Sequence, residues 1–382
     1  MTGRLLAVLS VLGVTGLSAL SLGGPVFYFV SWILIMMLLY ALLSLVAARY
    51  SLSFSQRLDS RTLERGDGGK LHVTLQLKSP LPIGPVRLPL ALPEGQAVAM
   101  MQAGFFREES AAFSLRFPHV GIWPVGAGKV ILQDFFGLLK LQVKVKEPLP
   151  RALVLPRRFD VLPLDFARMD DGRALPGRSG EDVTSPEDTR NYRLGDPFKR
   201  IHWKLSARSR ELIVRRFEIP EPPDTLLLLD CTAPQGGEDK PDGRARLIDT
   251  LAETALSVAA MQMSEGQPVR VPLYGERQSE FHADRQGALG LLKEELANQP
   301  FGGGVPFERV LNLELRRMRR TGATIVITTR LDAAVAEGVK NIRASGPNVR
   351  FYLITFTINA PEYSPYIALL KQNLVEVCYV TP

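Results

Sequence analysis

The chain has 382 residues, of which 46 are basic and 39 acidic, so its formal net charge is +7. This length suits about two or three domains, and an apolar content of 46% excludes a largely disordered protein. Two cysteines, Cys231 and Cys378, and four scattered histidines exclude a disulfide-stapled domain and a metal site with Cys/His spacing. We therefore expect buried thiols in a reducing compartment.

The N-terminal region is strongly apolar. Residues 5–48 contain no charged side chain, and a Gly-Gly-Pro turn at 23–25 divides them into two spans. Each span approaches the ~20 residues that cross a ~30 Å hydrocarbon core as a helix. We predict two transmembrane helices within residues 1–49. A signal peptide with Arg4 as its basic end is the alternative, but it would not need a second uncharged span.

The flanking charges predict an orientation for these spans. The turn between them lacks Lys and Arg, whereas Arg4 and Arg49 lie at the outer ends. By the positive-inside rule, both termini and everything after Arg49 face the cytoplasm. The chain is thus expected to be a two-span protein of the cell membrane.

Residues 50–148 are predicted to form a small all-β, sandwich-like domain. Apolar and polar side chains alternate there with the period of half-buried strands, at 71–77, 86–92, 113–117 and 139–145. Turns rich in glycine and proline separate these runs. Nothing in this region has the pattern of a catalytic site.

Residues 149–222 are predicted to be a connector that carries the most unusual charge pattern of the chain. Its first part is rich in Pro, Gly and Arg and has no helical period. An acidic, hydroxyl-rich run starts at Glu181, and nine basic but only two acidic residues follow between Arg190 and Phe217. We expect part of this positive charge to pair with the acidic run.

Within the basic stretch, Gly195-Asp196-Pro197 predicts the start of a helix. Aspartate caps free backbone N–H groups, and proline suits the first helical position. Three apolar residues would then share one helical face: Phe198, Ile201 and Leu205. A short strand is expected at 212–214.

Residues 223–382 are predicted to form a doubly wound α/β domain. The apolar run Thr225–Cys231 is typical of a strand buried in a parallel sheet. Helical patterns at 244–263, 286–297, 306–318, 332–345 and 361–373 alternate with strand patterns at 268–274, 277–283, 323–329, 348–357 and 374–380. Ligands of such sheets bind beyond the carboxyl ends of the strands, which directs attention to Asp230.

The basic stretch closely resembles the signature of the domain of unknown function 58 (DUF58) family. The residues that carry this resemblance are our candidate interaction site: Arg190, Tyr192, Gly195, Asp196, Arg200, Trp203, Arg208 and Glu218. The order of regions is also similar, with two membrane spans, a β domain, the signature and a domain similar to a von Willebrand factor A domain. Residues 134–138 resemble the family's DPFGLF segment, with Phe135 where proline is common.

This resemblance implies a membrane-bound partner of a MoxR-type AAA+ ATPase, and of transglutaminase-like membrane proteins, in the assembly or maturation of other proteins. It implies no established enzymatic activity. We therefore expect an adaptor or scaffold without catalysis of its own.

The resemblance also implies a place for a metal ion. A von Willebrand A site uses Asp-x-Ser-x-Ser after the first strand, whose oxygens suit Mg²⁺. Here the loop runs from Asp230 through Thr232 to Pro234, so the third ligand position has no side-chain oxygen, and Arg330 stands where a later acid is expected. We expect no metal and no cofactor, with Mg²⁺ at Asp230 and Thr232 as the alternative.

Other interpretations of the basic stretch stay open. Its cations would bind anionic lipid headgroups at the inner leaflet, or they would hold the β and α/β domains together as an interdomain latch. Nucleic-acid binding is disfavoured, because an acidic run adjoins the cations and no binding motif is present. A hydrolase using His202 and Ser206, one helical turn apart, lacks a nucleophile elbow.

Overall fold

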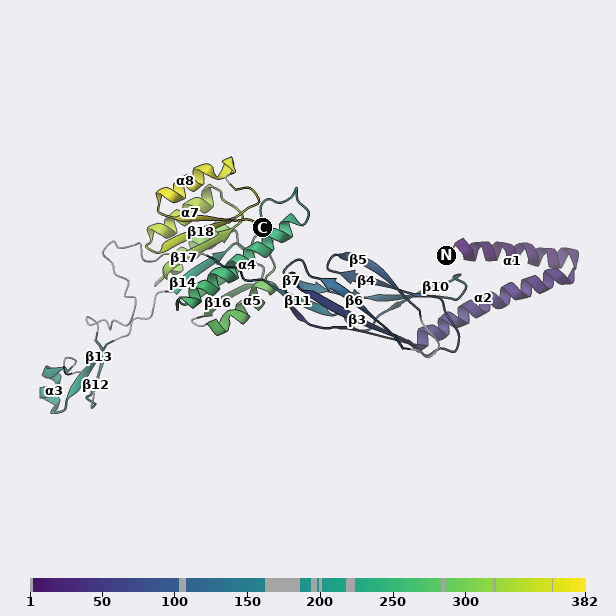
Figure 1. Cartoon of the computed structure of the whole chain (residues 1–382), viewed down its shortest axis with the longest axis horizontal. Helices are drawn as coiled ribbons and strands as arrows, with labels where there is room; N and C mark the ends of the chain where they lie inside the picture. The colour runs from purple at the N-terminus through teal and green to yellow at the C-terminus, as the bar shows by residue number, and fades with distance from the viewer. Residues whose placement is uncertain are drawn as a thin grey trace. The chain divides into compact units, whose positions relative to one another are not determined.

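The computed structural model (Figure 1) describes residues 3–102, 108–161, 186–193, 198, 201–217, 224–283, 286–318, 321–358 and 360–382. For residues 186–190, 215–217 and 286 the description is limited to the backbone. The chain divides into two compact units. One comprises Met1–Arg157 and Leu291–Gln299, and the other Arg158–Gly290 and Pro300–Pro382.

The first unit begins with two apolar helices, α1 (Gly3–Leu22) and α2 (Pro25–Ser51). Their most apolar windows have mean hydropathies of 2.2 and 2.5, so both are long and apolar enough to span a membrane. Pro25 occupies the first turn of α2, where its missing N–H costs no hydrogen bond. Between the helices, Ser31 Oγ donates to Thr15 Oγ1 at 3.2 Å.

A β-rich region with three sheets follows. Its strands are β1 (Leu52–Leu58), β2 (Thr62–Glu64), β3 (Gly68–Leu77), β4 (Val86–Leu92), β5 (Gly95–Met101), β6 (Glu108–Arg116), β7 (Gly121–Pro124), β8 (Gly126–Ala127), β9 (Lys129–Gln133), β10 (Lys140–Lys144) and β11 (Arg151–Leu155). The sheets have the orders β1-β3-β6, β10-β9-β4-β5 and β2-β11-β7, and β8 pairs with β4.

The predicted alternation along these strands is confirmed. Leu71, Val73 and Leu75 of β3 and Leu88 and Leu90 of β4 lie in one buried core, while their neighbours in the chain face outward. The start of the predicted connector was misjudged, because residues 151–155 form β11, which pairs in parallel with β2 and antiparallel with β7. A five-residue strand with few alternating positions gives little sequence signal.

The second unit contains a six-stranded sheet with the order β16-β15-β14-β17-β18-β19. Its strands are β14 (Asp224–Leu229), β15 (Val269–Tyr274), β16 (Gln278–Ala283), β17 (Thr321–Thr328), β18 (Asn348–Ile354) and β19 (Glu376–Val380). All neighbouring pairs are parallel except β15 and β16. The chain order reverses direction between β14 and β17, which is the switch point of a doubly wound sheet.

Helices connect these strands (Figure 1). They are α4 (Gly243–Ser264), α5 (Leu289–Asn298), α6 (Phe307–Arg317), α7 (Ala333–Ala344) and α8 (Ser364–Gln372), with short 3₁₀ turns η3 (Gln286–Ala288) and η4 (Pro361–Tyr363). One buried cluster joins β14, β17 and β18 to α6, α7 and α8, with Phe351 and Leu311 fully buried. Most of α5 belongs to the first unit, where Lys293 Nζ lies 2.7 Å from Glu64 Oε1.

A small segment precedes the sheet in the second unit. It consists of β12 (Pro186–Asn191), α3 (Trp203–Ser209) and β13 (Ile213–Phe217), and we call it the signature segment. β12 and β13 pair antiparallel.

Candidate functional site

The signature segment starts its helix later than the sequence indicated. The α-helix begins at Trp203, and Ile201 instead forms an antiparallel bridge to Val214 of β13. His202 is the N-cap, and its Nδ1 accepts a hydrogen bond from Leu205 N at 3.3 Å. The expected common face of Phe198, Ile201 and Leu205 is therefore wrong, because pairing with β13 holds Ile201 in extended backbone. The predicted cap at Asp196 lies outside the described residues.

A few side chains form the core of this segment. Ile201 and Val214 are buried, and Ser206 lies beside them. Ser206 Oγ accepts a hydrogen bond from Ile213 N at 2.9 Å, which ties α3 to β13. The described contacts of His202 and Ser206 thus go to backbone groups within the segment, which fits structural roles for both.

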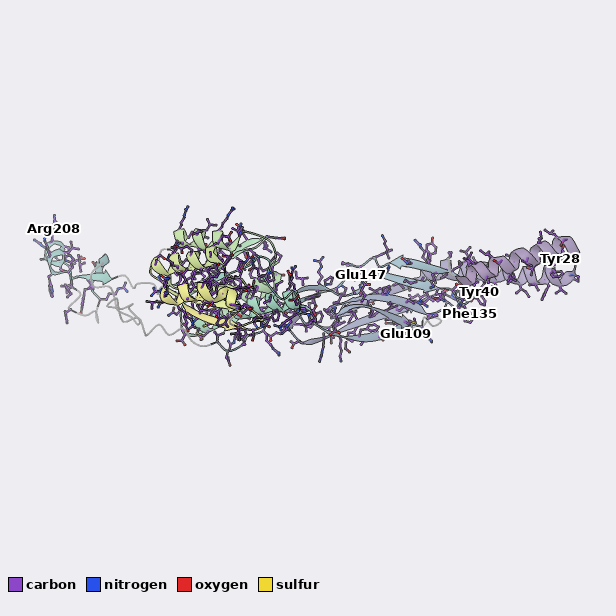
Figure 2. All side chains as sticks on the ribbon, turned by 90° about the horizontal axis from the view of Figure 1, so that it is seen from above. Tyr28, Tyr40, Glu109, Phe135, Glu147 and Arg208 are labelled. Carbon is purple, nitrogen blue, oxygen red and sulfur yellow. The ribbon has the colours of Figure 1, made fainter. Side chains whose placement is uncertain are left out.

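The face away from this core carries large aromatic side chains. Phe198 is 69% exposed and Trp203 is 63% exposed. Tyr192 stacks on Phe198 with ring centroids 6.0 Å apart and planes at 19°. Lys204 and Arg208 on α3 and Arg210 at its C-terminal end are exposed as well, and Figure 2 labels Arg208 there. The segment therefore presents a mixed aromatic and cationic surface.

The structure places the other candidate residues only in part. Gly195, Asp196, Arg200 and Glu218 lie outside the described residues. Arg190 lies on β12 opposite Val214, and the neighbouring register pairs Asp188 with Arg216. Of the eight signature positions, the structure thus brings four into one small folded segment: Arg190, Tyr192, Trp203 and Arg208.

A second candidate site lies at the switch point of the sheet. Asp230 follows β14 and is 2% exposed, and its Oδ1 accepts from Thr232 N at 3.0 Å and from Thr232 Oγ1 at 2.6 Å. Its Oδ2 accepts from Thr328 Oγ1, at the end of β17, at 2.7 Å. Asp230 therefore hydrogen-bonds its own loop and also joins the two central strands.

An arginine supplies the positive charge at this edge. Nε of Arg330 lies 3.2 Å from Asp230 Oδ2, an ion-pair distance, with side chains 18% and 3% exposed. Nη2 of Arg330 donates to Thr232 Oγ1 at 2.5 Å and to Ala233 O at 3.0 Å. A cavity of about 560 Å³ borders Arg330 and the loop Ala233–Asp239.

These residues do not fit the magnesium ion that a von Willebrand A domain would hold. The guanidinium of Arg330 takes the carboxylate and hydroxyl oxygens that would bind a cation, and Pro234 offers no side-chain oxygen. Asp332, the nearby acid, accepts from Val335 N at 2.8 Å and caps α7. Among the described residues, no group of three His, Cys, Asp or Glu side chains is arranged to hold a metal.

A third polar cluster, which no sequence pattern predicts, surrounds the buried Glu314 of α6. Its carboxylate accepts from Tyr274 Oη at 2.5 Å, from Arg270 Nη2 at 2.7 Å and from Arg317 Nη1 at 2.9 Å. Glu280 of β16 bridges both arginines at 3.0 Å. The spacing of these residues in the chain is too irregular to reveal them, and their full pairing marks them as structural.

The match to a protein family covers the region that holds both candidate sites. Residues 188–351 match the family described as protein of unknown function DUF58. The DUF58 match runs from β12 into β18 and includes Trp203, Asp230 and Arg330. The chain is also similar to the uncharacterized protein YeaD of Bacillus subtilis (strain 168), with 28% identity over 221 residues, covering 54% of this chain and 55% of YeaD. The match spans about half the length of that relative.

The likeness to solved structures is distant. The CARDB domain of the PF1109 protein from Pyrococcus furiosus gives a TM-score of 0.21 at 9% identity, over 27% of this chain and 87% of that one. Spo0M, a sporulation control protein from Bacillus subtilis, gives 0.17 at 11% identity, over 27% and 49%. Cwp6 from Clostridium difficile gives 0.19 at 8% identity, over 86% and 53%. TM-scores this low do not establish a shared fold.

Proposed function

We propose that this protein is a membrane-anchored adaptor, without catalysis of its own, that presents its signature segment to a MoxR-type AAA+ ATPase in the assembly or maturation of other proteins. The anchor in this proposal is the α1–α2 hairpin, with both termini in the cytoplasm. Its support is the apolar length of both helices and the distribution of flanking arginines.

The observation that carries the adaptor proposal is the exposed aromatic and cationic surface of the signature segment. Phe198 and Trp203 are 69% and 63% exposed although the segment has its own buried core at Ile201 and Val214. Solvent-exposed aromatic rings beside arginine are the composition of energetically dominant protein-interface residues. The partner surface is expected to be acidic, since Lys204, Arg208 and Arg210 of the same segment are exposed.

We also propose that the β14–β19 domain is organised like a von Willebrand A domain that works without a metal ion. Its support is the position of Asp230 and Thr232 after the first strand of a doubly wound sheet. Arg330 takes the role of the ion by neutralising Asp230. Partner binding at this edge would then be insensitive to chelators.

The test is affinity capture of the full-length protein from native membranes in detergent, with bound proteins identified by mass spectrometry. Recovery of an AAA+ ATPase by wild type, with loss of most of it in Trp203→Ala, is the expected result. Leu313→Ala is the matched control, since Leu313 of α6 is a 45% exposed apolar side chain outside the signature segment. Equal recovery by all three proteins, or no ATPase in repeated captures from wild type, contradicts the proposal.

A second candidate partner is an anionic membrane surface, which the exposed cations on α3 favour. Each Lys or Arg near such a surface contributes ~1 kcal/mol to binding. Charge reversal at Lys204 and Arg208 is expected to weaken whichever interaction uses these cations, so ATPase capture and binding to vesicles with and without phosphatidylserine are assayed separately. If the charge-reversed protein loses its phosphatidylserine-dependent vesicle binding but captures the ATPase as well as wild type does, the lipid function is selected.

A further inference from the structure

A tight turn between β9 and β10 exposes two aromatic rings. Asp134 is fully buried, and its Oδ2 accepts from Phe136 N at 2.9 Å while its Oδ1 accepts from Leu139 N at 2.5 Å. These bonds fix the turn, which Gly137 N closes by donating to Asp134 O at 3.0 Å. Phe135 is left 62% exposed and Phe136 40% exposed. The buried carboxylate of Asp134 thus fixes a turn on which the rings of Phe135 and Phe136 are exposed.

The turn lies against helix α2. Tyr40 of α2 contacts Phe136 edge to face, with ring centroids 5.9 Å apart at 70°, and Phe136 contacts Phe135 in the same way at 5.5 Å and 87°. Leu138 shares a small buried cluster with Leu5 and Ala41 of the helices. Figure 2 labels Tyr40 and Phe135 next to each other, and Tyr28 far along the hairpin.

The lengths of the helices place this contact near one edge of a bilayer. From Leu5 to the end of α1, and from the start of α2 to Ala41, each helix covers roughly 25 Å at 1.5 Å per residue, close to a ~30 Å hydrocarbon core. Beyond Ala41, α2 enters the β domain, where Leu45 and Ala48 belong to the buried core. The turn therefore lies where apolar helix surface ends and the β domain begins.

We propose that Phe135 and Phe136 insert into the membrane interface and seat the β domain on the bilayer, an inference that rests on the proposed membrane anchoring. Phenylalanine is among the side chains with which interfacial anchors bury into the boundary between headgroups and acyl chains. The rings continue the exposed apolar surface of α2, where Leu39, Leu42 and Leu43 are 46%, 54% and 50% exposed. This continuity identifies lipid as the occupant.

A cation accompanies the rings. A Cβ built on Gly137 would lie 3.0 Å from Nη1 of Arg4, so the guanidinium of Arg4 lies beside the turn. Arginine at a helix end extends its charge toward the phosphates while its methylenes stay in the apolar layer. The turn thus combines the aromatic and cationic groups of an interfacial anchor.

The experiment measures how deep three labelled positions lie in the bilayer, with the full-length protein in phosphatidylcholine vesicles. Each variant carries one introduced cysteine. An environment-sensitive fluorophore is attached at Phe135→Cys, Trp32→Cys or Ile122→Cys in a Cys378→Ser background. The remaining Cys231 is 2% exposed, and burial raises the pKa of its thiol to about 12, so it stays unlabelled. Trp32 on α2 and Ile122 on β7 are 59% and 50% exposed.

Nitroxide-labelled lipids then quench the fluorophore according to its depth. At Phe135→Cys, quenching by a nitroxide near the headgroup is expected to exceed the quenching at Ile122→Cys several-fold. Phe135→Trp keeps an aromatic ring and, with the three native tryptophans replaced by phenylalanine, must show the same shallow quenching of its own fluorescence. Trp32→Cys is quenched best by a nitroxide deep in the acyl chain.

The outcomes separate this inference from the anchoring on which it rests. If position 32 is quenched but position 135 is no more quenched than position 122, the turn is off the membrane and the inference is overturned, while anchoring stands. If position 32 is also unquenched, the anchoring proposal fails and the interfacial turn with it.

Discussion

Nε of Arg330 lies 3.2 Å from Oδ2 of Asp230, and this pair joins the loops that follow the two central strands of the α/β sheet. Both side chains are largely enclosed, at 18% and 3% exposure. The pair neutralises a buried carboxylate at the place where doubly wound sheets bind their ligands. Because the guanidinium of Arg330 already balances the charge of Asp230, no bound metal ion is needed there.

Replacement of Arg330 by alanine is expected to destabilise the protein strongly. Removing one partner of a buried pair leaves the other charge uncompensated, at a cost of about 3–5 kcal/mol. Arg244→Ala, which removes an exposed pair with Glu238, should cost no more than ~1 kcal/mol. Chemical denaturation of both variants measures the difference, and similar costs would show that Asp230 does not need its arginine.

The same pair predicts the response to magnesium. Wild-type protein should melt at the same temperature in EDTA and in Mg²⁺, because Arg330 already holds the oxygens of Asp230 and Thr232. A Mg²⁺-dependent rise in the melting temperature of wild type, lost in Asp230→Asn, would instead establish a functional metal site.

Glu314→Ala in α6 should be among the most destabilising substitutions in the helices of the α/β domain. Glu314 is fully buried and receives hydrogen bonds from Tyr274, Arg270 and Arg317, so its loss leaves the 13% exposed Arg270 without its buried partner. We expect a cost of about 3–5 kcal/mol. Glu337→Ala on α7, which breaks an exposed pair with Lys340, should cost ~0–1 kcal/mol. Equal unfolding midpoints would refute the assignment of Glu314 as a structural anchor.

The neighbouring Glu280 predicts an acid-sensitive stability. Burial alone would raise the pKa of its carboxyl, but hydrogen bonds from Arg270 and Arg317 and their charges outweigh burial and lower the pKa below its ordinary value of 4.5. The folded state then binds fewer protons than the unfolded state, so this stabilisation is present above pH 4.5 and is lost as the pH falls through the folded pKa. Melting temperatures should fall less steeply below pH 4.5 in Glu280→Gln than in wild type. An unchanged slope would mean that other carboxylates dominate acid unfolding.

Sequence patterns located most elements where their period was long and regular. The apolar run at Thr225–Cys231 and the alternation at 71–77 correspond to β14 and β3 because burial on two faces or on one face dictates those patterns directly. The described α-helix of the signature segment begins at Trp203, later than predicted. A local cap motif competes with tertiary pairing, and the bridge from Ile201 to Val214 prevails.

The candidate sites also divide into features that a local sequence pattern predicts and contacts that depend on the tertiary fold. Asp230 was identifiable because it ends a buried strand, and the deviation at Pro234 and Arg330 indicated a site unsuited to a metal. The contact of Arg330 with Thr232 depends on how two distant loops meet. The contact of Phe136 with Tyr40 of α2 likewise joins residues that are far apart in the chain. Neither contact has a local period from which to infer it.

Substitution of Gly137 should disturb the aromatic turn. Gly137 has φ of +72°, and an added Cβ would lie 2.6 Å from Gln133 Nε2 and 3.0 Å from Arg4 Nη1. The left-handed backbone alone costs a residue with a side chain about 1–2 kcal/mol. Gly137→Ala should therefore lower the melting temperature and weaken the shallow nitroxide quenching at position 135, because the turn is strained when a residue with a side chain adopts this positive φ. Gly128→Ala is the matched control, since Gly128 follows β8 with a φ outside the left-handed region and no atom within 4 Å of the added Cβ. Equal effects of the two substitutions would show that the turn does not depend on the conformation that glycine allows.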